Sequence, residues 1–177
     1  KYIIGFVGAV ALVVLAYLAY NKFVAEPSEK DAMNEMYTAK KYFDEAVSGG
    51  VVSDSLYKMA LEGGEGKYGM VDIAREYSGS PAANQANYYA GMAYLNLKDY
   101  TNAVKHLDEF SSDDKMLGPI AKGGIGDAFV QLDQNDKALE YYEKAFKANV
   151  NEFTTPLYLL KAAQVAINLG QNDKALG

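Results

Sequence analysis

The chain begins with an apolar run that no charged residue interrupts. Tyr2–Tyr20 holds nineteen uncharged residues, and Lys1 and Lys22 flank it. As a helix rising ~1.5 Å per residue, this run would reach about 28 Å, close to the hydrocarbon thickness of a bilayer. A signal peptide would have a shorter apolar region, and apolarity on all sides argues against a buried helix of a soluble protein. The run predicts a single transmembrane helix over residues 1–22, with interfacial rings at Tyr2, Tyr17, Tyr20 and Phe23. One lysine on each flank leaves its orientation open.

Beyond residue 22 the apolar positions recur at helical spacing. Pro27 and Ser28 predict a break and a helix cap. The helix that follows has an apolar face formed by Met33, Met36, Tyr37, Tyr42 and Phe43. No segment shows the apolar–polar alternation of a strand, so the predicted fold class is all-α. We interpret residues 23–83 as a juxtamembrane helix and a degenerate repeat whose second helix is Gly69–Tyr77.

The remainder of the chain repeats itself. Residues 91–110 align without a gap on residues 126–145, at an offset of 35, and a third copy begins at Gln164 with an offset of 37. Each copy places small, aromatic and alanine positions at fixed steps, as expected where helix pairs pack and stack into a solenoid. The predicted packing positions are Gly91, Tyr94, Ala103, Leu107, Gly126, Phe129, Ala138, Tyr142, Ala163 and Ala175.

This pattern resembles the tetratricopeptide repeat, with units predicted at 84–118 and 119–155 and a partial unit at 156–177. The chain departs from the repeat at the tryptophan-type positions, which are Asn87 and Lys122, and it lacks the usual final proline. The resemblance implies that the first helix of each unit lines a concave groove. The predicted groove positions are Tyr88, Met92, Leu95, Asn96, Ile120, Gly123, Asp127, Val130, Leu157, Leu160, Gln164 and Ile167.

None of these groove positions is Lys or Arg, so a clamp for a partner's carboxylates is not expected. Apolar side chains with amides and tyrosines favour a partner helix or an unfolded chain. The alternative is that several of these residues are core between the repeats.

The glycine-rich stretch AKGGIGDAF, residues 121–129, raises the question of a phosphate-binding loop. A dinucleotide fingerprint would need Gly or Ala where Phe129 stands, and no strand precedes the stretch. On a helix, Gly126 is the close-contact residue of the second repeat. Gly123 and Gly124 are additional glycines, each costing about 1 kcal/mol relative to alanine. Close packing explains them, and a flattened wall that lets a bound segment approach is the alternative.

The composition of the chain argues against nucleic-acid binding, catalysis and metal binding. The formal net charge of −6 disfavours nucleic acid, and the chain has no cysteine and one histidine. Asp133–Lys137 resembles the start of a calcium loop, but Ala138 and Lys144 occupy the positions that require Gly and Glu. His106 is expected on the helix surface. We therefore predict no enzyme activity, no catalytic or metal site, no cofactor and no small-molecule substrate.

The whole arrangement resembles the YfgM family. The resemblance rests on a single anchor combined with the sequence of residues 82–107 and with Phe153-Thr154-Thr155-Pro156. It implies a protein of the bacterial inner membrane with its repeat domain in the periplasm, associated with the SecYEG translocon and a membrane chaperone of the prolyl-isomerase type. The implied function is a non-enzymatic scaffold that binds this chaperone or emerging chains. A structural adaptor of another envelope machine, for secretion or motility, is the alternative.

Overall fold

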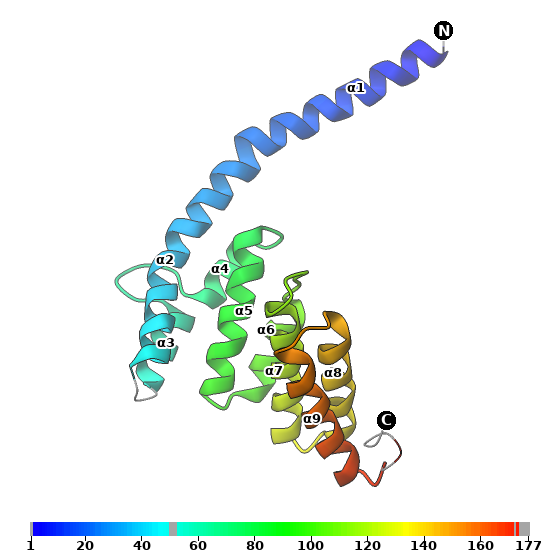
Figure 1. The fold of residues 1–177 in the computed structure, drawn as a ribbon. Helices are drawn as coiled ribbons and strands as arrows, with labels where there is room; N and C mark the ends of the chain where they lie inside the picture. Colours follow the sequence, from blue (N-terminus) through cyan, green and yellow to red (C-terminus); the bar gives the residue numbers. More distant parts are fainter. Residues whose placement is uncertain (1, 50–52, 172, 174–177) are drawn as a thin grey trace.

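The computed structural model describes residues 2–49, 53–171 and 173 (Figure 1). The side chains of residues 2–5, 8, 9, 23 and 27 lie outside this description. Every regular element within the described residues is helical, which confirms the all-α prediction. In chain order the elements are α1 (Tyr2–Tyr20), η1 (Asn21–Ala25), α2 (Glu26–Ser48), α3 (Asp54–Glu62), α4 (Met70–Glu76), α5 (Pro81–Asn96), α6 (Tyr100–Glu109), α7 (Leu117–Gln131), α8 (Asn135–Ala148) and α9 (Thr154–Asn168).

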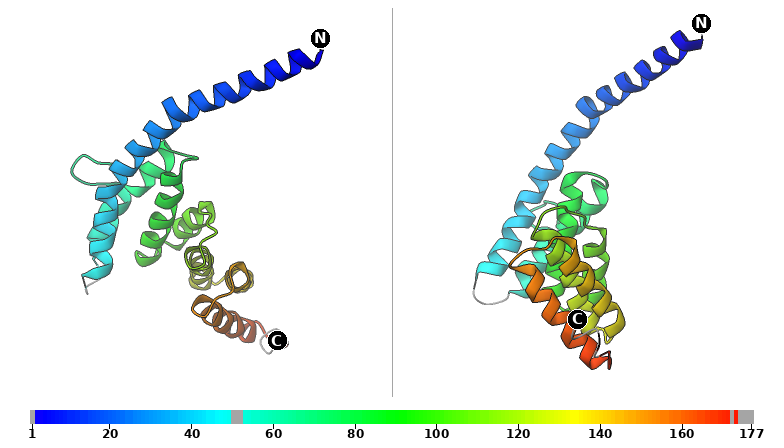
Figure 2. Two further views of the ribbon diagram at one scale, coloured as in Figure 1. Left: turned by 45° about the horizontal axis from the view of Figure 1, so that its top comes forward. Right: turned by 45° about the vertical axis from the view of Figure 1, so that its right-hand side comes forward.

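The first three elements form one long arm that projects from the helical domain (Figures 1 and 2). The predicted break at Pro27 and Ser28 is wrong, because α1 runs through the single π turn η1 into α2 without interruption. In that turn the Glu26 amide donates to the carbonyl of Asn21, five residues earlier. Pro27 falls in the first turn of α2, where the missing N–H of a proline costs little.

The sequence predicts that α1 spans a membrane. Among the described residues, no helix is long and apolar enough to cross a membrane. The side chains of Tyr17 and Tyr20 are exposed, whereas those of Tyr2 and Phe23 lie outside the described residues.

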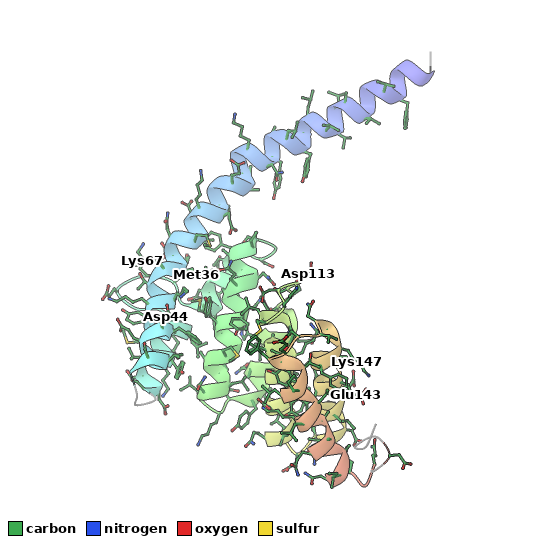
Figure 3. The ribbon with its side chains drawn as sticks, in the orientation of Figure 1. Met36, Asp44, Lys67, Asp113, Glu143 and Lys147 are labelled. Carbon is green, nitrogen blue, oxygen red and sulfur yellow. The ribbon has the colours of Figure 1, made fainter. Side chains whose placement is uncertain are left out.

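The second half of the arm packs against the domain. α2 contacts α3, α4 and α5, and its buried face carries Ala32, Met36 and Ala39 followed by Tyr42, Phe43 and Ala46. Met36 is labelled in Figure 3 on this side of α2. Met33 and Tyr37 were predicted on the same face, but they are exposed. The alanines mark where the helices approach most closely, and each of the two exposed residues lies one position, about 100°, around the helix from the buried face.

The repeats themselves appear in α5–α6, α7–α8 and α9, which follow one another across the lower part of the molecule (Figure 2). Each first helix ends two residues before a residue with positive φ, and the amide that follows this residue closes the turn onto a carbonyl of the helix. The three positive-φ residues are Lys98 (62°), Asp133 (55°) and Gly170 (72°). They are separated by 35 and 37 residues, so the backbone reproduces the register read from the sequence.

Two apolar cores hold the domain together. The first joins α2, α3, α4 and α5 around Phe43, Tyr57 and Ile73. The second joins α6, α7, α8 and α9 around Leu107 and Tyr142. Met92 of α5 touches both cores, so the degenerate N-terminal part and the repeats form one continuous stack.

Candidate functional site: the concave groove

The first helices α5, α7 and α9 carry the predicted groove residues, and two clefts lie along them. The aromatic cleft, of about 310 Å³, is lined by Asn84, Gln85, Tyr88, Tyr89, Phe110, Ser112 and Leu117. The amide cleft, of about 400 Å³, is lined by Leu95, Asn96, Tyr100, Asp127, Val130, Gln131 and Tyr142. Five predicted groove residues therefore line a cleft: Tyr88, Leu95, Asn96, Asp127 and Val130.

The remaining predicted groove residues differ in exposure. Met92 and Ile120 are half-buried. On α9 the groove positions form one exposed stripe along the helix, with 68% of Leu160 and 56% of Ile167 accessible. The other members of this stripe are Leu157 and Gln164. The structure thus brings the α5 and α7 residues together at the clefts, whereas the predicted α9 residues line neither cleft and are exposed.

Gly123 does not line the groove, contrary to the prediction. It is buried, and a Cβ added to it would lie 1.9 Å from Cε1 of Tyr158. The tyrosine ring from α9 therefore lies directly on the backbone of α7. The apparent opening left by a missing side chain is filled by a neighbouring helix.

The other two glycines of AKGGIGDAF serve two other neighbours. A Cβ on Gly126 would lie 2.6 Å from the ring of Tyr142, on α8. A Cβ on Gly124 would lie 3.0 Å from Cδ1 of Leu95, on α5. Each glycine admits a different helix, so close packing explains the whole stretch and a bound phosphate is not needed for it.

A charged cluster sits beside these contacts, on the groove side of α7. Nζ of Lys161 lies 2.6 and 2.8 Å from the two carboxylate oxygens of Asp127, and the Tyr142 hydroxyl donates to Asp127 at 2.6 Å. Burial, reinforced by Asp127, raises the pKa of Tyr142 far above its ordinary value. Burial, with smaller contributions from Asp127 and Tyr88, raises the pKa of Tyr158 to about 12. Both hydroxyls therefore remain protonated donors throughout the physiological range.

Lys161 was missed from the sequence, where the groove was expected to lack a cation. It follows Leu160 immediately, so it lies one position, about 100°, around the helix from the predicted groove residue. Its charge is paired with Asp127, so Lys161 would have to leave this ion pair to bind a partner's carboxylate.

His106 is buried, which corrects the expectation of a surface histidine. Its Nδ1 lies 2.8 Å from Oδ1 of Asn87, and its ring stacks on Tyr94 with centroids 5.5 Å apart. Burial lowers the pKa of His106, with Glu109 opposing and Lys105 adding to this effect. The pair fills the tryptophan-type position of the first repeat. Asn87 at that position was the available signal, because a buried amide needs a partner.

The predicted packing positions occupy the interfaces between helices. Gly91 is buried, and a Cβ there would lie 2.5 Å from Cγ of Leu107. Tyr94 and Ala163 are half-buried, and Ala175 lies outside the described residues. The other positions are buried: Ala103, Leu107, Gly126, Phe129, Ala138 and Tyr142.

The second helices form the outer wall of the stack. The ion pair of Lys147 with Glu143, at 2.9 Å, lies on the side of α8 that faces away from α5 (Figure 3). No group of three or more His, Asp or Glu side chains suited to a metal ion occurs among the described residues. The two clefts are lined by aromatic, aliphatic, amide and hydroxyl groups, with Asp127 as their one charged lining residue in the part of the chain that the structure describes.

Comparison with known families agrees with this geometry. Two segments, residues 70–114 and 121–150, each match a model of the tetratricopeptide repeat. Over these two segments the chain is similar to the tetratricopeptide repeat. The first match begins at the first residue of α4 and reaches past α6, and the second lies within α7, α8 and the loop that follows. No curated protein and no solved structure matches the chain. Tetratricopeptide repeats imply a scaffold for protein–protein interaction, and the unit boundaries given above remain predictions.

Proposed function

We propose that this protein is a membrane-anchored scaffold that holds a polypeptide partner in the groove of α5, α7 and α9. The observation that carries the proposal is the groove itself: two clefts lie along α5 and α7, and Leu160 and Ile167 are exposed on α9. Burial of exposed apolar surface stabilises a complex by about 25 cal/mol per Å². A partner that covers the exposed leucine and isoleucine of α9 would gain this free energy.

The proposed anchor is α1. Within the described residues, α1 contacts η1 and no other element, and its apolar side chains face outward, with 71% of Phe6 and 69% of Leu12 accessible. A helix of nineteen uncharged residues with no core to pack on is stabilised by lipid rather than water. The π turn η1 then lies at the end of the anchor and redirects the arm toward the repeat domain.

The resemblance to the YfgM family extends this proposal to a location and partners. On that basis the protein is in a bacterial inner membrane, its repeats are in the periplasm, and it assists the SecYEG translocon together with a chaperone of the prolyl-isomerase type. Anchoring would raise the concentration of the groove near emerging chains. The support is the combination of an uncharged N-terminal helix with repeats, and the groove chemistry is compatible with either a chaperone or an unfolded chain.

The test is purification of the full-length protein from native membranes in mild detergent, with identification of the co-purifying chains. We expect SecY, SecE and SecG in fixed proportion. Leu160→Glu, in the groove, should lose the groove-bound partner, whereas Val150→Glu, in an exposed loop, should retain it.

Two outcomes would contradict different parts of the proposal. Recovery of another envelope machine without any Sec subunit would remove the translocon role and leave the scaffold. An unchanged set of partners in Leu160→Glu would remove the groove as the binding surface.

A further inference from the structure

The aromatic cleft has a chemistry that the rest of the groove does not share. Tyr88 and Tyr89 meet edge to face with ring centroids 5.6 Å apart, and Tyr88 meets Phe110 at 5.1 Å. The three rings are half-buried, so each one keeps part of its surface open to the cleft. Gln85 stands exposed at the mouth of the cleft.

This cleft is held in shape before any partner arrives. Asn84 makes two hydrogen bonds to the backbone of Ser111, donating to its carbonyl at 2.8 Å and accepting from its amide at 2.9 Å. These bonds fix the extended segment after α6, and Phe110 at its start is thereby held against Tyr88. A preformed wall reduces the entropy that binding must spend.

The lining of the cleft excludes charged side chains. It consists of aromatic, aliphatic, amide and hydroxyl groups, with no ionisable acid or base other than tyrosine. A charged group desolvated there would find no counter-charge in the lining itself. A cation over the Tyr89 ring is disfavoured as well, because Nζ of Lys40 already lies 5.5 Å from its centroid.

We propose that the aromatic cleft binds a proline residue within an extended, uncharged stretch of the partner polypeptide. Proline-rich segments adopt an extended helix without internal hydrogen bonds, and they dock on aromatic grooves with little loss of entropy. The flat proline ring packs on the faces of Tyr88 and Phe110. The free carbonyls of the segment accept hydrogen bonds from the Gln85 amide and a tyrosine hydroxyl.

Size also favours an extended segment over a helix at this point. The cleft, at about 310 Å³, lies at the small end of the roughly 300–1,000 Å³ range of ligand pockets. It has room for one or two side chains and not for a turn of helix about 10 Å across. This inference rests on the proposed function, because it names the kind of segment that the groove receives.

The experiment is a titration of the full-length protein in detergent with a fluorescein-labelled peptide of ten prolines, followed by fluorescence polarisation. A ten-alanine peptide with the same label is the reference. We expect the proline peptide to bind and the alanine peptide to bind at least about tenfold more weakly, the size of a hot-spot loss. A peptide carrying trimethyl-lysine and an amphipathic helical peptide complete the set.

Matched variants locate the binding. Tyr88→Leu should weaken proline binding about tenfold and Gln85→Ala about threefold, whereas Tyr37→Leu on the exposed side of α2 and Gln134→Ala, at an exposed position before α8, should leave it unchanged. Far-ultraviolet circular dichroism confirms that each variant is folded. Gln85 is exposed, so its variant retains the test even where Tyr88→Leu unfolds.

The inference is overturned if the proline peptide does not bind, or if Gln85→Ala and folded Tyr88→Leu both bind it as tightly as the wild-type protein does. It is also overturned if the trimethyl-lysine peptide or the helical peptide binds more tightly than the proline peptide and loses this binding in Tyr88→Leu. This outcome can be distinguished from a failure of the proposed function, which the co-purification of partners with Leu160→Glu tests. Partners lost in Leu160→Glu but kept in folded Tyr88→Leu would leave the scaffold in place and remove only the proline site.

Discussion

The first helices of two repeats, α5 and α7, have equivalent positions with different side chains: in α5 they form a cleft, and in α7 neighbouring helices fill the space. Gly91 of α5 and Gly126 of α7 are equivalent, and each admits a side chain from its own second helix. Just before them, α5 has Tyr88 and Tyr89 where α7 has Gly123 and Gly124. The tyrosines build a cleft, whereas the glycines make room for Tyr158 and Leu95 from neighbouring helices.

This comparison shows which positions of a repeat carry the fold and which carry the surface. The shared glycine is required in both repeats, because the two helices of a pair cross there. The positions three and two residues before this glycine face the concave side or the next helix. Their side chains decide whether the groove has a cleft there or is filled by a neighbouring helix. A binding surface can therefore be localised to one repeat of a regular stack.

The largest expected effect comes from closing the gap in α7. Gly123→Ala would place Cβ against the Tyr158 ring, a rigid group that cannot rotate away. Overpacking costs about 1–3 kcal/mol or more, and the better helix propensity of alanine returns about 1 kcal/mol. We expect the free energy of unfolding to fall by about 2 kcal/mol, measured by urea denaturation with circular dichroism. The double variant Gly123→Ala/Tyr158→Leu should lose less than the sum of the single variants, and strict additivity would contradict the contact.

The shared glycine should give a smaller loss, similar in the two repeats. Gly91→Ala meets Leu107 at 2.5 Å and Gly126→Ala meets the Tyr142 ring at 2.6 Å. We expect each change to lower the free energy of unfolding by about 1–2 kcal/mol, because some overpacking strain remains after the gain in propensity. Thermal unfolding of both variants under one condition checks this. A loss confined to one repeat would show that the positions are not equivalent.

A pH effect should distinguish the two repeats next. The first repeat buries His106 against Asn87, whereas the equivalent position of the second repeat is Tyr141, whose hydroxyl donates to Asp108 at 2.8 Å. Because burial lowers the pKa of His106 in the fold, the neutral ring stabilises the protein above the unfolded pKa of about 6.5. This contribution is lost as the pH falls below that value, at no more than about 1.4 kcal/mol per pH unit.

The measurement is the free energy of unfolding between pH 7.5 and 5.5. His106→Gln keeps an amide donor for Asn87 and removes the titration, so it should flatten the curve in this range. An equal slope in the variant would assign the pH dependence to other groups.

The smallest effect is expected at Gly124. Its added Cβ would meet Cδ1 atoms of Leu95 and Leu107 at 3.0 and 3.1 Å, the flexible ends of two leucines that can shift by a few tenths of an ångström. The remaining strain and the gain in helix propensity should nearly cancel. We expect Gly124→Ala to leave the free energy of unfolding, measured by urea denaturation, within about 0.5 kcal/mol of wild type. A loss as large as that of Gly123→Ala would contradict the distinction between the two neighbours.

The sequence predicts the repeats well because their packing is local. The offset that aligns Gly91 with Gly126 also aligns the positive-φ residues Lys98 and Asp133, so one pattern sets both the helix contacts and the turns. The break expected at Pro27 is absent because a proline in the first turn of a helix leaves it intact.

The site was harder to predict, since it depends on contacts between different repeats. Nothing near Gly123 in the sequence indicates that Tyr158 covers it, and nothing near Lys161 indicates that Asp127 pairs with it. His106 looks like a surface residue among its charged neighbours until Asn87 is placed opposite it. In each case the partner lies nineteen or more residues away, beyond the reach of helical periodicity.

The central claim is that the first-helix face, and not the outer wall, holds a protein partner. A photo-reactive amino acid placed at Leu160 in the groove, or at exposed Lys105 on α6, tests it directly in the full-length protein in native membranes. We predict a defined crosslinked species from position 160, with its partner identified by mass spectrometry, and none from position 105. Equal crosslinking from both positions, or a defined species from position 105 alone, would contradict the account.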